Sequence, residues 1–212
     1  MQRNGIINPF TLKAGFESGE TYQKTSVELN YKLSYHGREN GLDIRLFAGA
    51  MLKEDLRIPF YSFSSSGRSG RELYLYPGTY PDRFAIFPAN FWSRQMSLSE
   101  GGLVSPVNDS LGYRRWLVSF SFTSSLPGKT SRLPVKPFVN ILLSDHGFDS
   151  ENGLPVFFEA GLKTGIRNIF EIYVPLLVSS NTHSAAGSFK NRIRFVFSLD
   201  SFGRLNFNSK VF

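Results

Sequence analysis

The sequence predicts an all-β fold of antiparallel strands, and two observations carry this prediction. Polar and apolar residues alternate with a period of two in many segments, as they do in strands with one apolar face. By contrast, no window of about 11 residues has the periodicity of an amphipathic helix. Aromatic residues make up 15% of the 212 residues although the mean hydropathy is −0.17. Aromatics spread singly among polar residues are typical of β-barrels.

The clearest alternation runs from Ser26 to Tyr35, where polar residues separate successive apolar ones. Because successive strand side chains point to opposite sides, this segment predicts one apolar and one polar face. Similar alternation is found in four further segments, which are residues 42–52, 115–123, 156–163 and 192–200.

Five less regular segments are also candidate strands, namely residues 8–17, 56–64, 83–92, 135–144 and 168–179. The last of these contains Pro175, which cannot donate a ladder hydrogen bond, so we expect a bulge or weak pairing there. Together the segments predict a barrel or partial barrel of roughly eight to ten strands. We expect it to fill one domain, residues 1–212, with long polar connections such as 93–112 as outer loops.

Strand length favours a membrane-spanning barrel over a soluble one. A tilted strand needs roughly 9–11 residues to cross a bilayer, whereas soluble strands average about 5–6. Segments such as 26–36 and 113–123 reach the longer value, and aromatic residues end their apolar faces. The residues predicted to face lipid are Val27, Leu29, Tyr31, Leu33, Tyr35, Trp116, Val118, Phe120, Phe122, Val156, Phe158, Ile193, Phe195 and Phe197.

The opposite faces of these strands carry charges of both signs. The residues predicted to line the lumen are Glu28, Lys32, Asp43, Arg45, Glu159, Lys163, Arg192 and Arg194. Buried charges must pair or stay hydrated, because each otherwise costs several kcal/mol. We therefore expect ion pairs to plug a small barrel, and a selective channel is the alternative.

Other functional classes have little support. The net charge of +7 is scattered along the chain, so no nucleic-acid partner is predicted. His146 lies between Asp145 and Asp149 and could belong to a Ca²⁺ or transition-metal site, but a polar loop is the simpler interpretation. We predict no metal, no cofactor and no catalytic residues. A soluble β-barrel or β-sandwich that binds a small ligand or carbohydrate remains the alternative fold and function.

Several segments resemble a known family. They are Gly41–Gly49, Ser69–Tyr76 with Thr79 and Tyr80, Trp116–Ser119, Leu133–Lys136, Asn168–Leu176 and Arg192–Leu199. Over about residues 25–200 the chain resembles the C-terminal region of large aminopeptidase-like zinc metalloproteases (gluzincin-type) of Gram-negative bacteria. The resemblance implies an outer-membrane barrel that follows a peptidase domain. It places the last strand at 192–200 and makes residues 201–212 a C-terminal tail.

The resemblance does not extend to catalysis. The zinc site of such peptidases needs a His-Glu-x-x-His helix, and the three histidines here, His36, His146 and His183, do not form that motif. We therefore expect a non-enzymatic barrel that anchors an associated or formerly fused peptidase domain in the outer membrane. Its partners are outer-membrane lipid and either a peptidase domain or further barrel strands. Residues 1–20 lack a secretory signal, so we expect a mature or partial chain.

Overall fold

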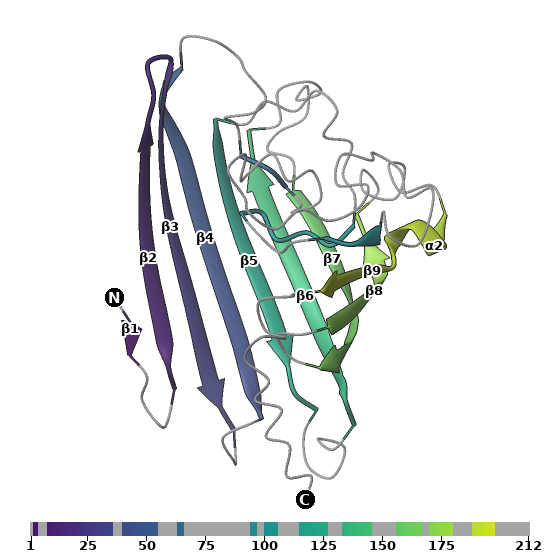
Figure 1. Ribbon diagram of the computed structural model, residues 1–212. Helices are drawn as coiled ribbons and strands as arrows, with labels where there is room; N and C mark the ends of the chain where they lie inside the picture. The colour runs from purple at the N-terminus through teal and green to yellow at the C-terminus, as the bar shows by residue number, and fades with distance from the viewer. Residues whose placement is uncertain are drawn as a thin grey trace, which may run out of the picture.

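The described part of the chain forms one nine-stranded antiparallel sheet. The computed structural model describes residues 2–3, 8–35, 40–54, 63–65, 94–96, 100–105, 115–126, 133–145, 156–166, 170–179 and 188–197. Each strand pairs with the next one along the chain, so the order in the sheet is the order in the sequence (Figure 1). The all-β, antiparallel prediction is confirmed.

Most of the strands are long, and three of the five alternating segments form the longest of them. Their bounds are β1 Gln2–Arg3, β2 Phe10–Ser18, β3 Tyr22–Ser34, β4 Gly41–Glu54, β5 Trp116–Ser124, β6 Val135–Ser144, β7 Val156–Ile166, β8 Phe170–Val178 and β9 Arg194–Phe197. A four-residue helix, α2, spans Phe189–Arg192 just before β9. Among the described helices, none has the length and apolar character needed to cross a membrane.

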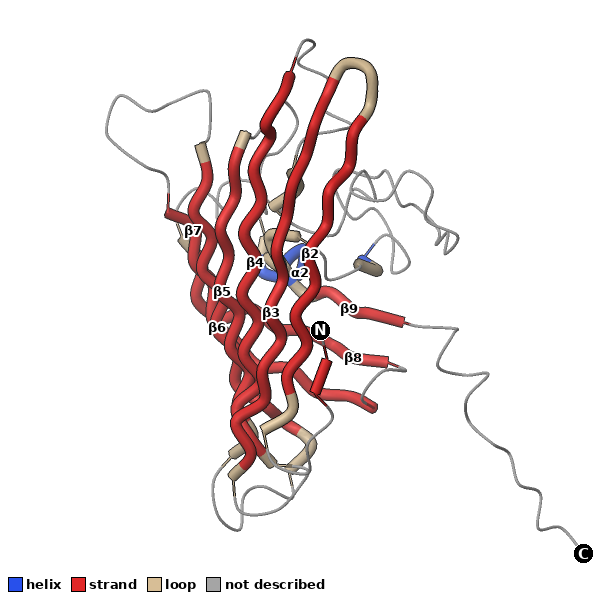
Figure 2. The backbone as a smooth tube through the Cα atoms, turned by 90° about the vertical axis from the view of Figure 1, so that its left-hand side faces the viewer, coloured by secondary structure: helices blue, strands red, loops and turns tan. Residues whose placement is uncertain are grey.

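The sheet curves into an open trough. In Figure 1 strands β1 and β2 lie at the left of the molecule and β8 and β9 at the right. Seen from the side in Figure 2, β2, β8 and β9 all lie to the same side of β5, β6 and β7. In the described residues β1 and β9 do not pair with each other. The fold is therefore compatible with a partial barrel. We call the inside of the trough the concave face and its opposite side the outer face.

Part of the long connection between β4 and β5 packs against the concave face. Phe63 and Leu103 from this connection join Phe47, Leu117, Leu142 and Phe157 in one buried cluster. A second cluster contains Met96, Val104, Phe138 and Tyr173. The core thus lies inside the trough, where burial of apolar area stabilises the sheet from one side only.

Three of the less regular segments form strands as predicted, namely 8–17, 135–144 and 168–179. The bulge near Pro175 is also confirmed, because the β7–β8 register shifts between Ala160 and Gly161, opposite Leu177 and Pro175. The segment 83–92, most of 56–64, and the predicted tail 201–212 lie outside the described residues.

The last alternating segment differs from its prediction. Strand β9 begins at Arg194, and Arg192 ends the preceding helix α2. Ser188 is the N-cap residue of this helix, and the Asn191 amide donates to its carbonyl at 3.0 Å. Because Phe189–Arg192 take the helical conformation, the strand begins only at Arg194, which alternation alone does not indicate. Residues 198–200 lie outside the described residues.

Candidate functional site

The outer face is a continuous apolar surface across the central strands. The register aligns Leu29, Leu46, Phe120, Ile141 and Phe158 in one row that runs from β3 to β7. A neighbouring row consists of Val27, Ala48, Val118, Leu143 and Val156. Val27 and Phe158 remain 47% and 45% exposed, so no described segment covers these positions.

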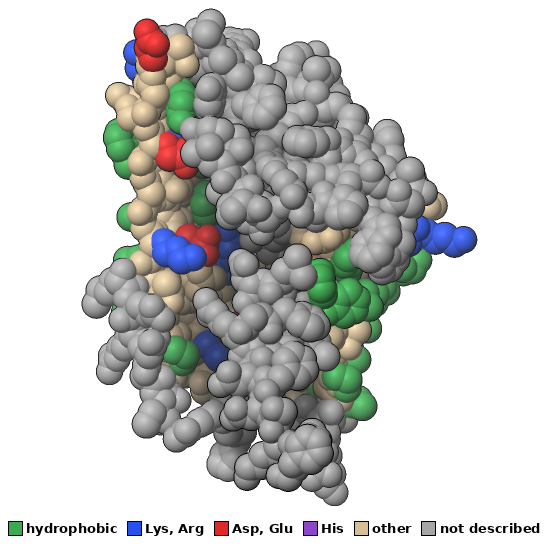
Figure 3. All heavy atoms as spheres, viewed as in Figure 1, with side chains coloured by type: hydrophobic (Ala, Val, Ile, Leu, Met, Phe, Trp, Pro, Cys, Tyr) green, Lys and Arg blue, Asp and Glu red, His purple; other side chains and the backbone are tan. Residues whose placement is uncertain are grey.

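Charged residues avoid this surface. In β2–β9, leaving aside Lys53 and Glu54 beyond the bulge of β4, every charged residue falls on the concave side of the alternation. Figure 3 shows basic and acidic side chains together inside the trough, with apolar side chains along its left outline. The concave charges are Lys13, Glu17, Lys24, Glu28, Lys32, Asp43, Arg45, Lys136, Glu159, Lys163, Glu171 and Arg194.

Most of the predicted lipid-facing residues lie on the outer face of described strands. Tyr35 follows the end of β3, is exposed, and its hydroxyl lies 3.0 Å from that of Ser124. The three residues predicted to face lipid near the β9 edge of the sheet differ in placement and in exposure. Ile193 lies between α2 and β9 and not in a strand, Phe195 is only 4% exposed, and Phe197 is 36% exposed.

Seven of the eight charged residues predicted to line the lumen lie on the concave face of a strand. The eighth, Arg192, belongs to helix α2. Arg45 forms an ion pair with Glu28 at 3.2 Å. Lys163 pairs with Glu171 at 3.3 Å, and the Tyr173 hydroxyl donates to the same carboxylate at 2.7 Å. Four charged side chains of the concave face thus have local partners of opposite sign.

Glu100 connects the β4–β5 connection to three strands. Lys24 donates to its carboxylate at 2.5 Å, and both side chains are largely buried. Arg45 donates to the Glu100 backbone carbonyl at 2.7 Å, and the Ser119 hydroxyl donates to it at 3.1 Å. The Ser64 amide donates to the other carboxylate oxygen at 2.5 Å. One residue thus satisfies donors from β3, β4, β5 and its own connection.

Glu159 forms a second attachment point and is fully buried. Its carboxylate accepts the backbone amides of Val104 at 2.6 Å and Ser105 at 2.9 Å. Asn140, directly opposite on β6, donates its side-chain amide at 2.7 Å. A buried carboxylate is tolerated when several hydrogen bonds replace its hydration. This arrangement fixes residues 104–105 against the sheet.

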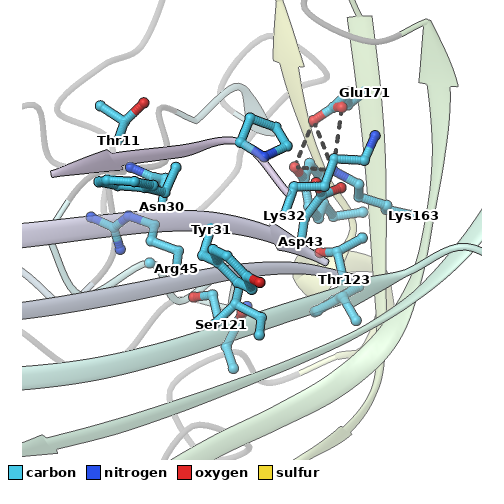
Figure 4. A pocket seen from close by; sticks show the side chains of 17 residues that line it. Thr11, Asn30, Tyr31, Lys32, Asp43, Arg45, Ser121, Thr123, Lys163 and Glu171 are labelled. Carbon is cyan, nitrogen blue, oxygen red and sulfur yellow. Dashed lines mark hydrogen bonds and ion pairs between the residues drawn. The ribbon is translucent and has the colours of Figure 1, made fainter. Parts of the chain in front are cut away.

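A cavity of about 400 Å³ remains beside these attachments. It extends across the trough from residues of β2 and β3 to residues of β7 and β8. Figure 4 shows Lys32, Asp43, Lys163 and Glu171 near one another at one end of it, with Asn30 and Arg45 toward the other end. Lys32 and Asp43 are cross-strand neighbours in the register. The lining therefore carries both signs of charge beside apolar side chains such as Ile44 and Phe138.

Several important residues of this site were not predicted from the sequence. Lys24 was not identified because its segment alternates regularly only from Ser26 onward. Glu100 lies in a connection that the sequence indicates to be an outer polar loop. The signal for Asn140 and Glu171 was weak, since both lie in less regular segments. In the described residues no group of three or more potential metal ligands occurs, and His146 lies outside them.

Replacing Lys24 with methionine tests the attachment of Glu100. Methionine keeps much of the apolar stem but removes the ammonium, which leaves the buried carboxylate with one less donor. We expect a loss of about 1–3 kcal/mol in unfolding free energy, and faster hydrogen exchange at Gly101 and Leu103, whose amides donate to Ser64 and Ser65. Lys13→Met is the control, because this side chain is mostly exposed. Equal effects of the two variants would contradict the assignment.

No match was found to family models, to curated proteins or to solved structures.

Proposed function

We propose that the chain is a β-barrel region of a Gram-negative outer membrane, with its outer face in contact with lipid. The observation that carries this proposal is the separation of charge. An outer face exposed to water would be expected to carry charged residues, and soluble monomers rarely expose apolar patches larger than a few hundred Å². A strand face that meets hydrocarbon has to be apolar, whereas the opposite face can hold charge and water.

The length of the strands supports the same proposal. Strands β3, β4 and β7 have 13, 14 and 11 residues, which is enough for a tilted strand to cross a bilayer. The alternative is a soluble β fold that binds a small ligand in the 400 Å³ cavity. A soluble fold would leave the uncharged outer face in water, and this exposure disfavours the alternative.

The second part of the proposal is that the barrel anchors an associated domain and does not conduct. Its support is the buried contacts of Glu100 and Glu159, which hold part of the β4–β5 connection inside the trough. The resemblance to the C-terminal regions of zinc metalloproteases suggests a peptidase as the anchored domain.

Fluorescence of Trp116 tests the lipid contact. The chain has two tryptophans, so Trp92→Phe leaves Trp116 as the only one. Trp116 lies opposite Ala50 on the outer face. After folding into phosphatidylcholine vesicles, we expect lipids brominated on the acyl chains to quench its emission several-fold more than aqueous acrylamide does. Free tryptophan with the same vesicles is the control. Quenching by acrylamide alone would argue for a water-soluble fold.

A further inference from the structure

The two edges of the sheet differ in how they are covered. At β9 the chain covers its own edge, because the Met96 amide donates to the Phe195 carbonyl at 2.9 Å and Gln95 forms a bridge with Phe195. At the other end, β1 pairs only with Phe10 and Thr11 of β2. From Lys13 to Ser18 no described strand lies against the outer edge of β2, and these residues are exposed.

The hydrogen bonds show which backbone groups face this edge. The Lys32 amide donates to the Pro9 carbonyl at 3.0 Å. Pro9 and the odd-numbered residues after it therefore direct their backbone hydrogen bonds toward β3. Along an antiparallel strand the backbone amide and carbonyl groups of successive residues point alternately to the two edges. The amides and carbonyls of Ala14, Phe16 and Ser18 therefore point toward the uncovered edge.

The edge is complementary to a second copy of itself. If two β2 strands run antiparallel about a twofold axis at Gly15, Lys13 of each copy lies opposite Glu17 of the other. Ala14 then lies opposite Phe16, which matches their edge-directed backbone groups. Both charged residues stay on the concave face, while Ala14 and Phe16 stay on the outer face. Opposite charges across a ladder stabilise it, and a twofold interface repeats each contact.

We propose that this edge of β2 joins two copies of the chain into a symmetric dimer. The inference rests on the proposed membrane location, because unpaired backbone groups at a sheet edge are far more costly in hydrocarbon than in water. A twofold pairing satisfies the groups of Ala14 and Phe16 in both copies. It extends the apolar outer face without interruption.

Disulfide formation tests the pairing, because the chain has no cysteine. At the twofold axis Gly15 forms a non-hydrogen-bonded pair with its copy, where Cα atoms lie about 4.5 Å apart, within the disulfide range. We expect Gly15→Cys to form covalent dimers in vesicles when copper phenanthroline is added as the oxidant. Its new Cβ would meet only the Ser26 hydroxyl, which can rotate away. Ser26→Cys, on the adjacent strand and the same face, is the control and is expected to remain monomeric.

A charge exchange tests the complementarity independently of disulfide formation. Lys13→Glu or Glu17→Lys alone places like charges in both symmetric pairs, and we expect dimer dissociation to increase about 5- to 30-fold. The double exchange is expected to restore the dimer, which is measured by energy transfer between labelled copies in vesicles. If Gly15→Cys stays monomeric while Trp116 is quenched by brominated lipid, the dimer is wrong and the membrane proposal stands. If Trp116 is not quenched, the membrane proposal itself fails.

Discussion

Glu159→Ala is expected to lower the unfolding free energy by about 3–5 kcal/mol. The variant removes a fully buried carboxylate and leaves three donors, the amides of Val104 and Ser105 and the side chain of Asn140, without their acceptor. A buried donor without a partner costs about 1–3 kcal/mol. Urea unfolding in detergent micelles, followed by circular dichroism, measures the change.

The matched control is Glu28→Ala, which removes another concave-face carboxylate. Glu28 is partly exposed and pairs with Arg45 and Lys13, so water can replace its contacts. We expect it to cost at most about 1 kcal/mol. Hydrogen exchange at residues 104–105 is expected to increase in Glu159→Ala and not in Glu28→Ala. Similar losses in both variants would show that the Glu159 contacts do not hold the β4–β5 connection in place.

Val139→Arg is expected to destabilise the protein by about 2–4 kcal/mol in a bilayer, which is the cost of an arginine on the lipid face of a barrel near the midplane. Val139 is 39% exposed and lies on the outer face of β6, opposite Phe122. In a soluble protein the same exposed substitution would change stability by only about 0.5 kcal/mol. Unfolding by urea from lipid vesicles measures the difference.

Thr123→Arg is the control for this substitution. It adds the same charge on the concave face, beside the cavity and opposite Asp43. We expect a change below about 1 kcal/mol, because the new cation gains a carboxylate neighbour and remains hydrated. If Val139→Arg were as mild as Thr123→Arg, the outer face would not be in contact with hydrocarbon.

Alternation predicted the strands and the two faces well, because a strand with one apolar face repeats every two residues whatever its neighbours are. Val27, Phe120 and Phe158 were assigned to one surface for this reason, and the register places them there. Strand β8 was harder, since the bulge at Pro175 interrupts its period. The start of β9 was misplaced because the alternation continues through Arg192.

The attachments inside the trough were not predictable from local pattern. Glu100 and Val104 contact strands that are distant in sequence, and their connection has the polar composition of a surface loop. Burial of such a segment depends on tertiary partners, namely Lys24, Glu159 and Asn140. Each partner lies in a different strand, so no sequence period relates them. The charges themselves could be predicted, but their pairing required the fold.

The most direct test of the account is a cysteine scan of β3 from Ser26 to Tyr31, made possible by the absence of native cysteine. Each variant carries a spin label and is folded into lipid vesicles, where collision rates with oxygen and with a water-soluble nickel complex are measured. If the outer face is in contact with lipid, oxygen accessibility is high and nickel accessibility is low at positions 27, 29 and 31, and not at 26, 28 and 30. Nickel accessibility at position 27 equal to that at exposed Lys190→Cys would contradict the contact with lipid.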